Sequence, residues 1–365
     1  MIQMQISSEF PPISQPMVFR LRTIIPKDPQ ELDNCDAVLI SEEDHFSEFD
    51  LQGFSIRLKL ENVHDFDGDV ILAVPGRKSV HRLVRSQSKH NTFLVTEQCD
   101  QKCVMCSQPP KKHHQDLFDC FLDAVRLAPI GATIGISGGE PMLHKDRLFH
   151  FLIKSQKLRP DVRFHILTNG QHFTSGDQRT LSLLDLRSIL WGIPIYSADA
   201  EIHDRIVAKT GAHEVLLQNL AFLGSVGGLI ELRTVLLRSN VQGLASLADH
   251  ITTFQPFAHY WAIMQLENIG YGRMNWAGEF YDNSVAFDPI AKSIDLATAR
   301  GIPPSLFNFP LCTVPDDYRP NCFASISDWK QKFIHECRGC ALRSTCGGFF
   351  EWYPEDNGFS RIAAQ

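Results

Sequence analysis

The chain has 365 residues, of which 44% are hydrophobic and 21% charged, a composition typical of globular proteins and not of disordered or fibrous ones. Single cores rarely exceed roughly 250–300 residues, so we expect two or three domains. The formal net charge of −7 disfavours a nucleic-acid partner. No secretory signal and no bilayer-spanning apolar run is visible, which predicts a cytoplasmic protein without a membrane partner.

The first 90 residues contain short apolar stretches separated by Pro, Gly, Asp and Asn. Residues 54–60 alternate between apolar and polar side chains, which is typical of a half-buried strand. We therefore predict a small, mainly β domain over residues 1–90. Its lone Cys35 is interpreted as a structural or surface thiol.

A short apolar run then leads into a loop that carries three cysteines, Cys99, Cys103 and Cys106. Their spacing lets one short loop place three thiolates around an iron–sulfur cluster, and thiolates are the usual ligands of such clusters. The fourth iron would keep an open coordination site. A structural zinc site would need a fourth ligand, and none lies at a suitable spacing, although His113 and His114 follow. A disulfide framework is disfavoured because the odd count strands one thiol.

Strands and helices alternate from residue 91 to about residue 286. After the first strand, further strands are predicted at 133–139, 163–170, 188–197, 229–238 and 259–266. Helices are predicted between them at 116–128, 145–158, 178–186, 214–223 and 241–254. This alternation indicates an α/β fold with a parallel sheet. Six units are fewer than the eight of a closed barrel, so we predict a partial (β/α)6 barrel over residues 91–286, with Cys120 as a core residue of the first helix.

In parallel barrels the loops that follow the strands carry the active site. The second such loop contains Gly138, Gly139 and Glu140, where the glycines permit close backbone approach and the carboxylate can accept from an ammonium group. Later loops contribute Thr168-Asn169-Gly170, and Ser197 and Asp199 followed by His203-Asp204. Arg233 lies inside an apolar strand and needs a partner, for which Glu231 is one choice.

The last third, residues 287–365, begins with a predicted helix at 289–300 and continues into a Pro-rich passage. It then carries five cysteines, Cys312, Cys322, Cys337, Cys340 and Cys346. Their density indicates a second metal site, which we assign to Cys312, Cys337, Cys340 and Cys346. A structural zinc ribbon could use the same four ligands. Cys322 either replaces one of them or is a free thiol able to give a hydrogen atom to a substrate radical.

The cysteine loop, including Met105, resembles the signature of the radical S-adenosylmethionine (SAM) superfamily. Gly138-Gly139-Glu140-Pro141, the Thr168-Asn169-Gly170 segment and the Ser197 region resemble further motifs of that superfamily, in the same order. The resemblance covers roughly residues 91–270. It implies a [4Fe–4S] cluster on Cys99, Cys103 and Cys106 whose open iron binds SAM. It also implies SAM contacts from Met105, Gly138, Gly139, Glu140, Asn169, Ser197 and Arg233.

The C-terminal cysteines resemble the auxiliary-cluster (SPASM or twitch) domains of peptide-modifying radical SAM enzymes. The next cysteine of that pattern would fall at position 350, where this chain has Phe350, so we expect one auxiliary [4Fe–4S] cluster and not two. The segments PLCTVP and SISDWK and the final cysteine run resemble the C-type radical SAM maturases of the His-Xaa-Ser system.

These resemblances imply reductive cleavage of SAM to a 5′-deoxyadenosyl radical, which abstracts hydrogen from a residue of a ribosomally synthesised peptide. The expected partners are a precursor peptide, with His-Xaa-Ser repeats on the narrower resemblance, and a reductase, flavodoxin or ferredoxin that donates electrons. The N-terminal β domain could bind the peptide by adding a strand to a sheet edge. Two alternatives stay open: a radical SAM enzyme acting on a small molecule or nucleotide, and a non-catalytic metal- or redox-binding protein.

Overall fold

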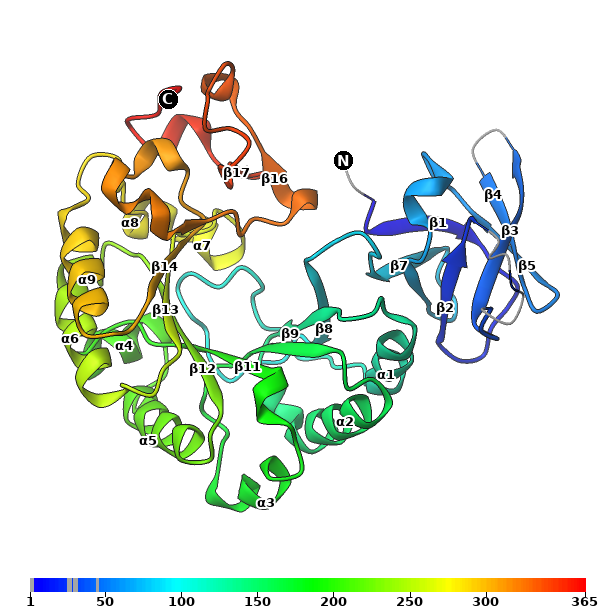
Figure 1. The fold of residues 1–365 in the computed structure, drawn as a ribbon, viewed down its shortest axis with the longest axis horizontal. Helices are drawn as coiled ribbons and strands as arrows, with labels where there is room; N and C mark the ends of the chain where they lie inside the picture. The colour runs from blue at the N-terminus through cyan, green and yellow to red at the C-terminus, as the bar shows by residue number, and fades with distance from the viewer. Residues whose placement is uncertain (1–2, 25–27, 29–31, 44–45) are drawn as a thin grey trace.

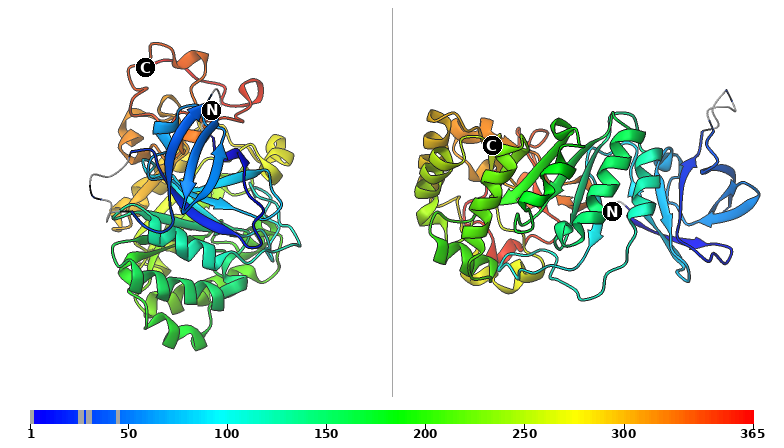
Figure 2. Two further views of the ribbon diagram at one scale, coloured as in Figure 1. Left: turned by 90° about the vertical axis from the view of Figure 1, so that its right-hand side faces the viewer. Right: turned by 90° about the horizontal axis from the view of Figure 1, so that it is seen from below.

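The computed structural model describes residues 3–24, 28, 32–43 and 46–365. Figure 1 shows a small β-barrel at the N-terminal end, a large curved sheet with helices on its outer side, and a C-terminal lobe of short turns above the far end of the sheet. Figure 2 shows that the barrel projects from the side of the sheet that carries its first strands. The barrel and the C-terminal lobe thus flank the curved sheet.

Seven strands form the N-terminal barrel, in the order β1-β5-β4-β3-β2-β6-β7, and the barrel is closed. The strands are β1 (Gln5–Glu9), β2 (Met17–Arg22), β3 (Asp36–Glu43), β4 (Phe46–Leu51), β5 (Phe54–Leu58), β6 (Val70–Ala73) and β7 (Ser79–Val84). Apolar side chains including Phe19, Phe49 and Ile56 fill its interior and are fully buried.

The β content of this region was predicted, but its closure was not. Among the described residues every barrel strand pairs on both sides. The proposed addition of a peptide strand therefore finds no open edge here, because closing a barrel removes the unpaired N–H and C=O groups that such an addition needs.

The large sheet has eight strands in the order β15-β14-β13-β12-β11-β10-β9-β8, and neighbouring strands run parallel. They are β8 (Asn91–Thr96), β9 (Thr133–Gly138), β10 (Arg163–Leu167), β11 (Ile189–Pro194), β12 (Leu229–Val235), β13 (Tyr260–Met264), β14 (Pro304–Phe307) and β15 (Cys322–Phe323). The prediction of six strands was wrong in number. The last two are too short and too rich in flanking proline to give a strand pattern in sequence.

Helices cover the outer side of the sheet (Figure 1). The nine α-helices of the described chain are α1 (Phe118–Leu127), α2 (Lys145–Leu158), α3 (Gln178–Leu181), α4 (Ala200–Val207), α5 (Ala212–Ser225), α6 (Leu244–Phe254), α7 (Gly270–Met274), α8 (Trp276–Glu279) and α9 (Asp288–Ala299). The prediction missed α4, α7 and α8 and made α3 too long. Helices of four to eight residues have too few turns to show an apolar stripe.

Successive side chains of a strand point to opposite faces, and the two faces of this sheet differ in polarity. Ile166, Trp191, Leu232 and Ile263 belong to the apolar core under the helices. The alternate positions face the concave side and include the ion pair between Arg233 and Glu231. Polar groups are thus gathered inside the curve of the sheet.

Beyond β15 the chain forms short 3-10 turns and one hairpin-like pair, β16 (Gln331–Lys332) with β17 (Phe349–Phe350). Arg85, between β7 and β8, makes a two-bonded ion pair with Asp328 of this lobe at 2.6 and 2.5 Å. Across the described residues, none of the helices has the length and apolarity of a bilayer-spanning segment.

Candidate functional site

The cysteine loop starts directly after β8 and is held at several points by backbone hydrogen bonds. Val104 N donates to the Ile206 carbonyl at the end of α4 at 2.9 Å, and Tyr271 N in α7 donates to the Cys106 carbonyl at 2.8 Å. The side chain of Asn275 donates to the Val104 carbonyl at 2.8 Å. The loop is therefore fixed between α4 and α7, two helices that the sequence patterns did not reveal.

The glycine pair after β9 packs against the start of this loop. Gly139 N donates to Thr96 O at 2.8 Å, and Glu140 N donates to Gln98 O at 2.7 Å. A Cβ at Gly138 would lie 2.0 Å from Thr96 O, and one at Gly139 would lie 2.1 Å from Gln98 O. Gly138 also has φ +141°, where side chains are disfavoured. Both glycines are thus needed for the two loops to meet.

Glu140 is fully buried and joins the second loop to the third. Its carboxylate accepts from the Thr168 hydroxyl at 2.6 Å and from Asn169 N at 2.5 Å, and also from the nearby Met142 N. Burial raises the pKa of Glu140, while these donors stabilise its charged form. Three protein donors thus give it a positioning role, and its contact with a methionyl ammonium group stays a prediction.

Asp100, which the sequence analysis missed, connects the cysteine loop to Asn169. Its carboxylate accepts from Asn169 Nδ2 at 2.8 Å and contacts His172 at 3.3 Å, and it forms an ion pair with Lys209. Burial raises the pKa of Asp100, but the hydrogen bonds from His172, Lys209 and Asn169 outweigh it and hold the pKa well below its usual value. The signal in the sequence that could have identified Asp100 was an acidic residue directly after the first cysteine.

The three thiols of the loop are partly buried. Burial raises the pKa of Cys99 to about 11 and that of Cys103 to about 12, and it also raises that of Cys106. Deprotonation therefore needs a cation at the sulfurs, as metal binding supplies. In the described residues no three His, Cys, Asp or Glu side chains already surround a common metal position. The donor set nevertheless fits a thiophilic metal such as iron, because all three ligands are sulfur.

Met105 is buried in an apolar cluster with Tyr196, Leu237 and Leu266. The Ser197 motif serves the local fold: Ser197 Oγ accepts from Asp199 N at 3.0 Å, and Asp199 caps the start of α4. Contacts of Met105 and Ser197 with SAM stay predictions.

Arg233 has the structural partner considered in the sequence analysis. It donates to Glu231 at 2.7 Å, and Glu231 is fully buried. Arg233 itself keeps 18% side-chain exposure toward the concave side. A structural ion pair is therefore present, and the arginine still reaches accessible space.

Residues 93–250 match the sequence profile described as the radical SAM superfamily. These residues form a radical SAM domain. The match contains the cysteine loop, Gly138, Gly139, Glu140, Asn169, Ser197 and Arg233. A search of curated proteins found no match to the chain.

Solved structures with a similar fold include SuiB from Streptococcus suis bound to the precursor peptide SuiA, at TM-score 0.50 and 15% identity, over 61% of this chain and 49% of SuiB. SuiB bound to S-adenosylmethionine gives TM-score 0.49 and 15% identity over 61% and 51% of the two chains. A domain of pyruvate-formate lyase-activating enzyme from Bacteroides vulgatus gives TM-score 0.37 and 14% identity, over 47% of this chain and 96% of that domain. The match spans about half of SuiB, and at this identity it concerns the fold alone.

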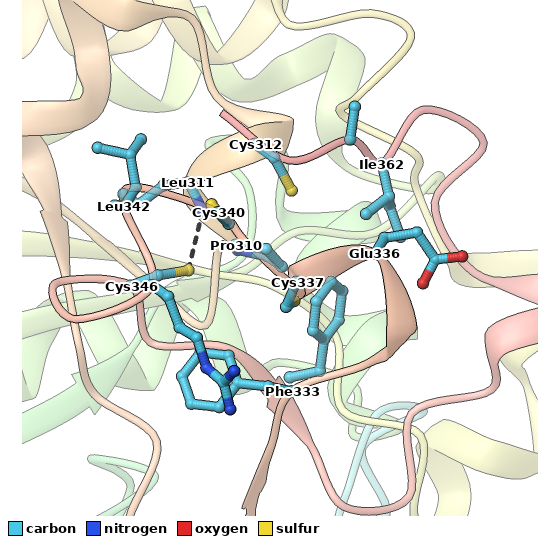
Figure 3. A pocket seen from close by; sticks show the side chains of 13 residues that line it. Pro310, Leu311, Cys312, Phe333, Glu336, Cys337, Cys340, Leu342, Cys346 and Ile362 are labelled. Atoms are coloured by element: carbon cyan, nitrogen blue, oxygen red, sulfur yellow. Dashed lines mark hydrogen bonds between the residues drawn. The ribbon is translucent and has the colours of Figure 1, made fainter.

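Outside the radical SAM domain, four cysteines line one small cavity in the C-terminal lobe (Figure 3). They are Cys312, Cys337, Cys340 and Cys346. Cys346 Sγ accepts backbone N–H groups from Leu311 and Gly348, both at 3.4 Å. Burial raises the pKa of Cys312 to about 11. Apolar residues such as Phe333 and Phe349 also line the cavity, and the thiol donors fit iron or zinc.

Cys322 does not belong to this cavity lining. It pairs with Leu306 in the sheet, and both pack against the apolar core under the helices. Its neighbour Phe323 contacts Phe307 on the opposite face. Cys322 therefore faces away from the concave side, and this placement favours neither a ligand role nor a hydrogen-atom donor role.

Proposed function

We propose that the chain is a radical SAM enzyme that cleaves SAM reductively. The observation that carries the proposal is the convergence of three loops: the cysteine loop, the glycine pair that packs on it, and the Asn169 loop tied to both by Glu140 and Asp100. Cys99, Cys103 and Cys106 would hold a [4Fe–4S] cluster. With SAM bound, this cofactor pair supplies a 5′-deoxyadenosyl radical, chemistry that no side chain performs.

The protein's own contribution is to orient the ligands and to limit access of water. The loop backbone is held on both sides by α4 and α7, so the chain that carries the three cysteines is fixed before a cluster binds, and the thiol side chains would turn toward it. Asp100 and Glu140 hold the Asn169 amide at the same end of the sheet, where it is expected to lie beside the ribose.

In the C-terminal lobe, Cys312, Cys337, Cys340 and Cys346 would hold one auxiliary cluster. Four sulfurs around one cavity support this proposal. Four thiolates would saturate a [4Fe–4S] cluster, so this site would transfer electrons or support the lobe and leave the radical chemistry to the first site. A zinc ion is the competing occupant.

The proposed substrate is a residue of a ribosomally synthesised peptide, and the narrower proposal is a His-Xaa-Ser-type precursor. The support is the resemblance of the C-terminal cysteine pattern to those of peptide-modifying enzymes. An electron-donating flavodoxin, ferredoxin or reductase completes the proposed system. Since the N-terminal barrel is closed, peptide recognition by strand addition is not proposed for it.

Anaerobic reconstitution with iron and sulfide, followed by incubation with SAM and dithionite, tests the proposal. We expect 5′-deoxyadenosine from the wild type and from Cys120→Ser, since Cys120 packs against the helical core. We expect none from Cys99→Ala. Absence of 5′-deoxyadenosine from iron-loaded wild type would reject the enzyme proposal in favour of a metal- or redox-binding protein.

The peptide substrate needs a separate test. The reconstituted enzyme is incubated with the candidate precursor peptide in heavy water, and the peptide mass is read. A loss of two hydrogens indicates bond formation or oxidation, whereas deuterium uptake indicates epimerisation. Turnover of a small molecule or nucleotide, with no peptide change, would favour the alternative substrate class.

A further inference from the structure

One position in the sheet lacks a side chain where the strands on both sides carry polar side chains, a histidine and an arginine. A Cβ at Gly192 of β11 would lie 2.7 Å from Leu167 Cδ2, 3.0 Å from His165 Nε2 and 3.1 Å from Arg233 Cδ. His165 is on β10 and Arg233 on β12, so side chains from the two flanking strands meet over Gly192. Glycine within a strand often marks such a close approach.

Glu231 lies at the centre of this group. It is fully buried, accepts from Arg233 Nη1 at 2.7 Å and forms an ion pair with His165. Burial raises the pKa of Glu231, but Arg233 and His165 outweigh that effect and lower it overall. A buried carboxylate requires such compensation, and the requirement in turn fixes the position of the arginine.

The guanidinium of Arg233 keeps 18% side-chain exposure and makes one further contact within the protein. Its second contact is from Nη2 to Met264 Sδ at 3.1 Å. Among the described residues these two contacts use two of its five N–H donors. Gly192 pairs with Leu167, and Pro194 pairs with Arg233, so Arg233 lies level with the residue two beyond Leu167, which is Asn169.

We propose that Gly192 and Glu231 are positioning residues that hold the Arg233 guanidinium for the carboxylate of SAM. The inference rests on the proposed function, because it takes SAM as the ligand. A planar guanidinium pre-oriented by one carboxylate is well suited to bind a second one. The space at Gly192 is what lets Arg233 and Glu231 adopt this arrangement.

The test compares SAM with decarboxylated SAM, which lacks only the carboxylate, by equilibrium dialysis on reconstituted protein. Gly192→Ala, Glu231→Asp and Arg233→Gln are each expected to weaken SAM binding about 10- to 100-fold and to leave decarboxylated SAM unaffected. Glu231→Asp keeps the carboxylate charge but shortens the side chain by one methylene group. The double variant Gly192→Ala/Arg233→Gln should be no weaker than Arg233→Gln alone, since both act through one contact.

Gly135→Ala is the matched control. Its Cβ would lie 2.7 Å from Thr92 Oγ1, which is comparable crowding on β9, but away from Arg233. Iron content and thermal unfolding report whether each variant folds. An equal loss of affinity for SAM and for decarboxylated SAM, or an unchanged affinity for SAM, would overturn the inference. If the wild type forms 5′-deoxyadenosine in that case, the proposed function still stands.

Discussion

The two cysteine sites differ in how the chain assembles them. The first takes three sulfurs from one loop of eight residues, and Asp100 of this loop is hydrogen-bonded to Asn169, which in turn contacts Glu140. The second collects four sulfurs from two chain segments around a cavity lined largely by apolar residues. Three ligands leave a coordination position for a reactant, whereas four leave none. The number of sulfurs and the polarity around them thus separate a proposed catalytic site from a proposed supporting one.

The largest expected effect comes from removing one sulfur at each site. Cys103→Ala should lose about four irons per chain and all 5′-deoxyadenosine formation. Cys312→Ala should also lose about four irons but keep 5′-deoxyadenosine formation. Iron analysis and electron paramagnetic resonance measure both. Equal loss of activity in the two variants would contradict the division of roles, and zinc in place of iron at the second site would replace the auxiliary cluster with a zinc ribbon.

Glycines near the two sites should respond very differently to alanine. Gly139→Ala puts a Cβ 2.1 Å from the Gln98 carbonyl, a backbone atom that cannot rotate away, so we expect a loss of about 3 kcal/mol in unfolding free energy. Gly347→Ala meets its nearest neighbour at 3.4 Å and should cost at most about 0.5 kcal/mol. Urea unfolding of both variants checks this, and similar costs would refute the stated packing.

Removing an ion pair should affect SAM binding near the cysteine loop but not in the C-terminal lobe. Asp100→Asn removes the charge that pairs with Lys209 beside the cysteine loop, and we expect SAM affinity to fall about fivefold while iron content is retained. Glu355→Gln breaks the exposed pair with Lys332 in the C-terminal lobe and should change neither quantity. Dialysis and iron analysis provide the measurements. An unchanged SAM affinity in Asp100→Asn would show that this network does not support binding.

The smallest effect concerns the ion pair that joins Arg85, between β7 and β8, to Asp328 of the C-terminal lobe. Hydrogen bonds from Arg85 lower the pKa of Asp328 from its ordinary value of 3.8, so the pair stabilises the fold above that pH and the benefit is lost as pH falls through the lowered pKa. Asp328 is about half exposed, so Asp328→Asn should cost at most about 1 kcal/mol near pH 7. Thermal unfolding from pH 7 to 3 should show the two proteins converging. A constant difference would contradict the electrostatic origin.

Much of the fold could be read from sequence because long elements carry their own periodicity. The helix expected at residues 145–158 matches α2, Lys145–Leu158, and the first six strands of the sheet were confirmed. The failures are β14, β15, α4 and α7, which are short and take their conformation from neighbours in space. Closure of the N-terminal barrel was also missed, because strand pairing between distant residues leaves no local signal.

At the candidate site, the spacing of residues within the motifs predicted which residues lie near one another, but not which atoms their side chains contact. The glycine pair and the cysteine loop come together as their motifs suggested. The Glu140 carboxylate, by contrast, accepts hydrogen bonds from Thr168 and Asn169, and Asp100 was assigned no role although it lies within the cysteine motif. Side-chain contacts such as these depend on how segments distant in the sequence pack together, so no local pattern in a single sequence predicts them.

The strands of the N-terminal barrel all lie between residues 5 and 84, which has a consequence for biosynthesis. Domains generally fold as units in the order in which they are synthesised, so the barrel can close before the sheet that follows it is complete. Asp328, the partner of Arg85, is synthesised much later. The chain therefore passes through a stage in which the barrel and the first cysteines have been made and the C-terminal lobe has not.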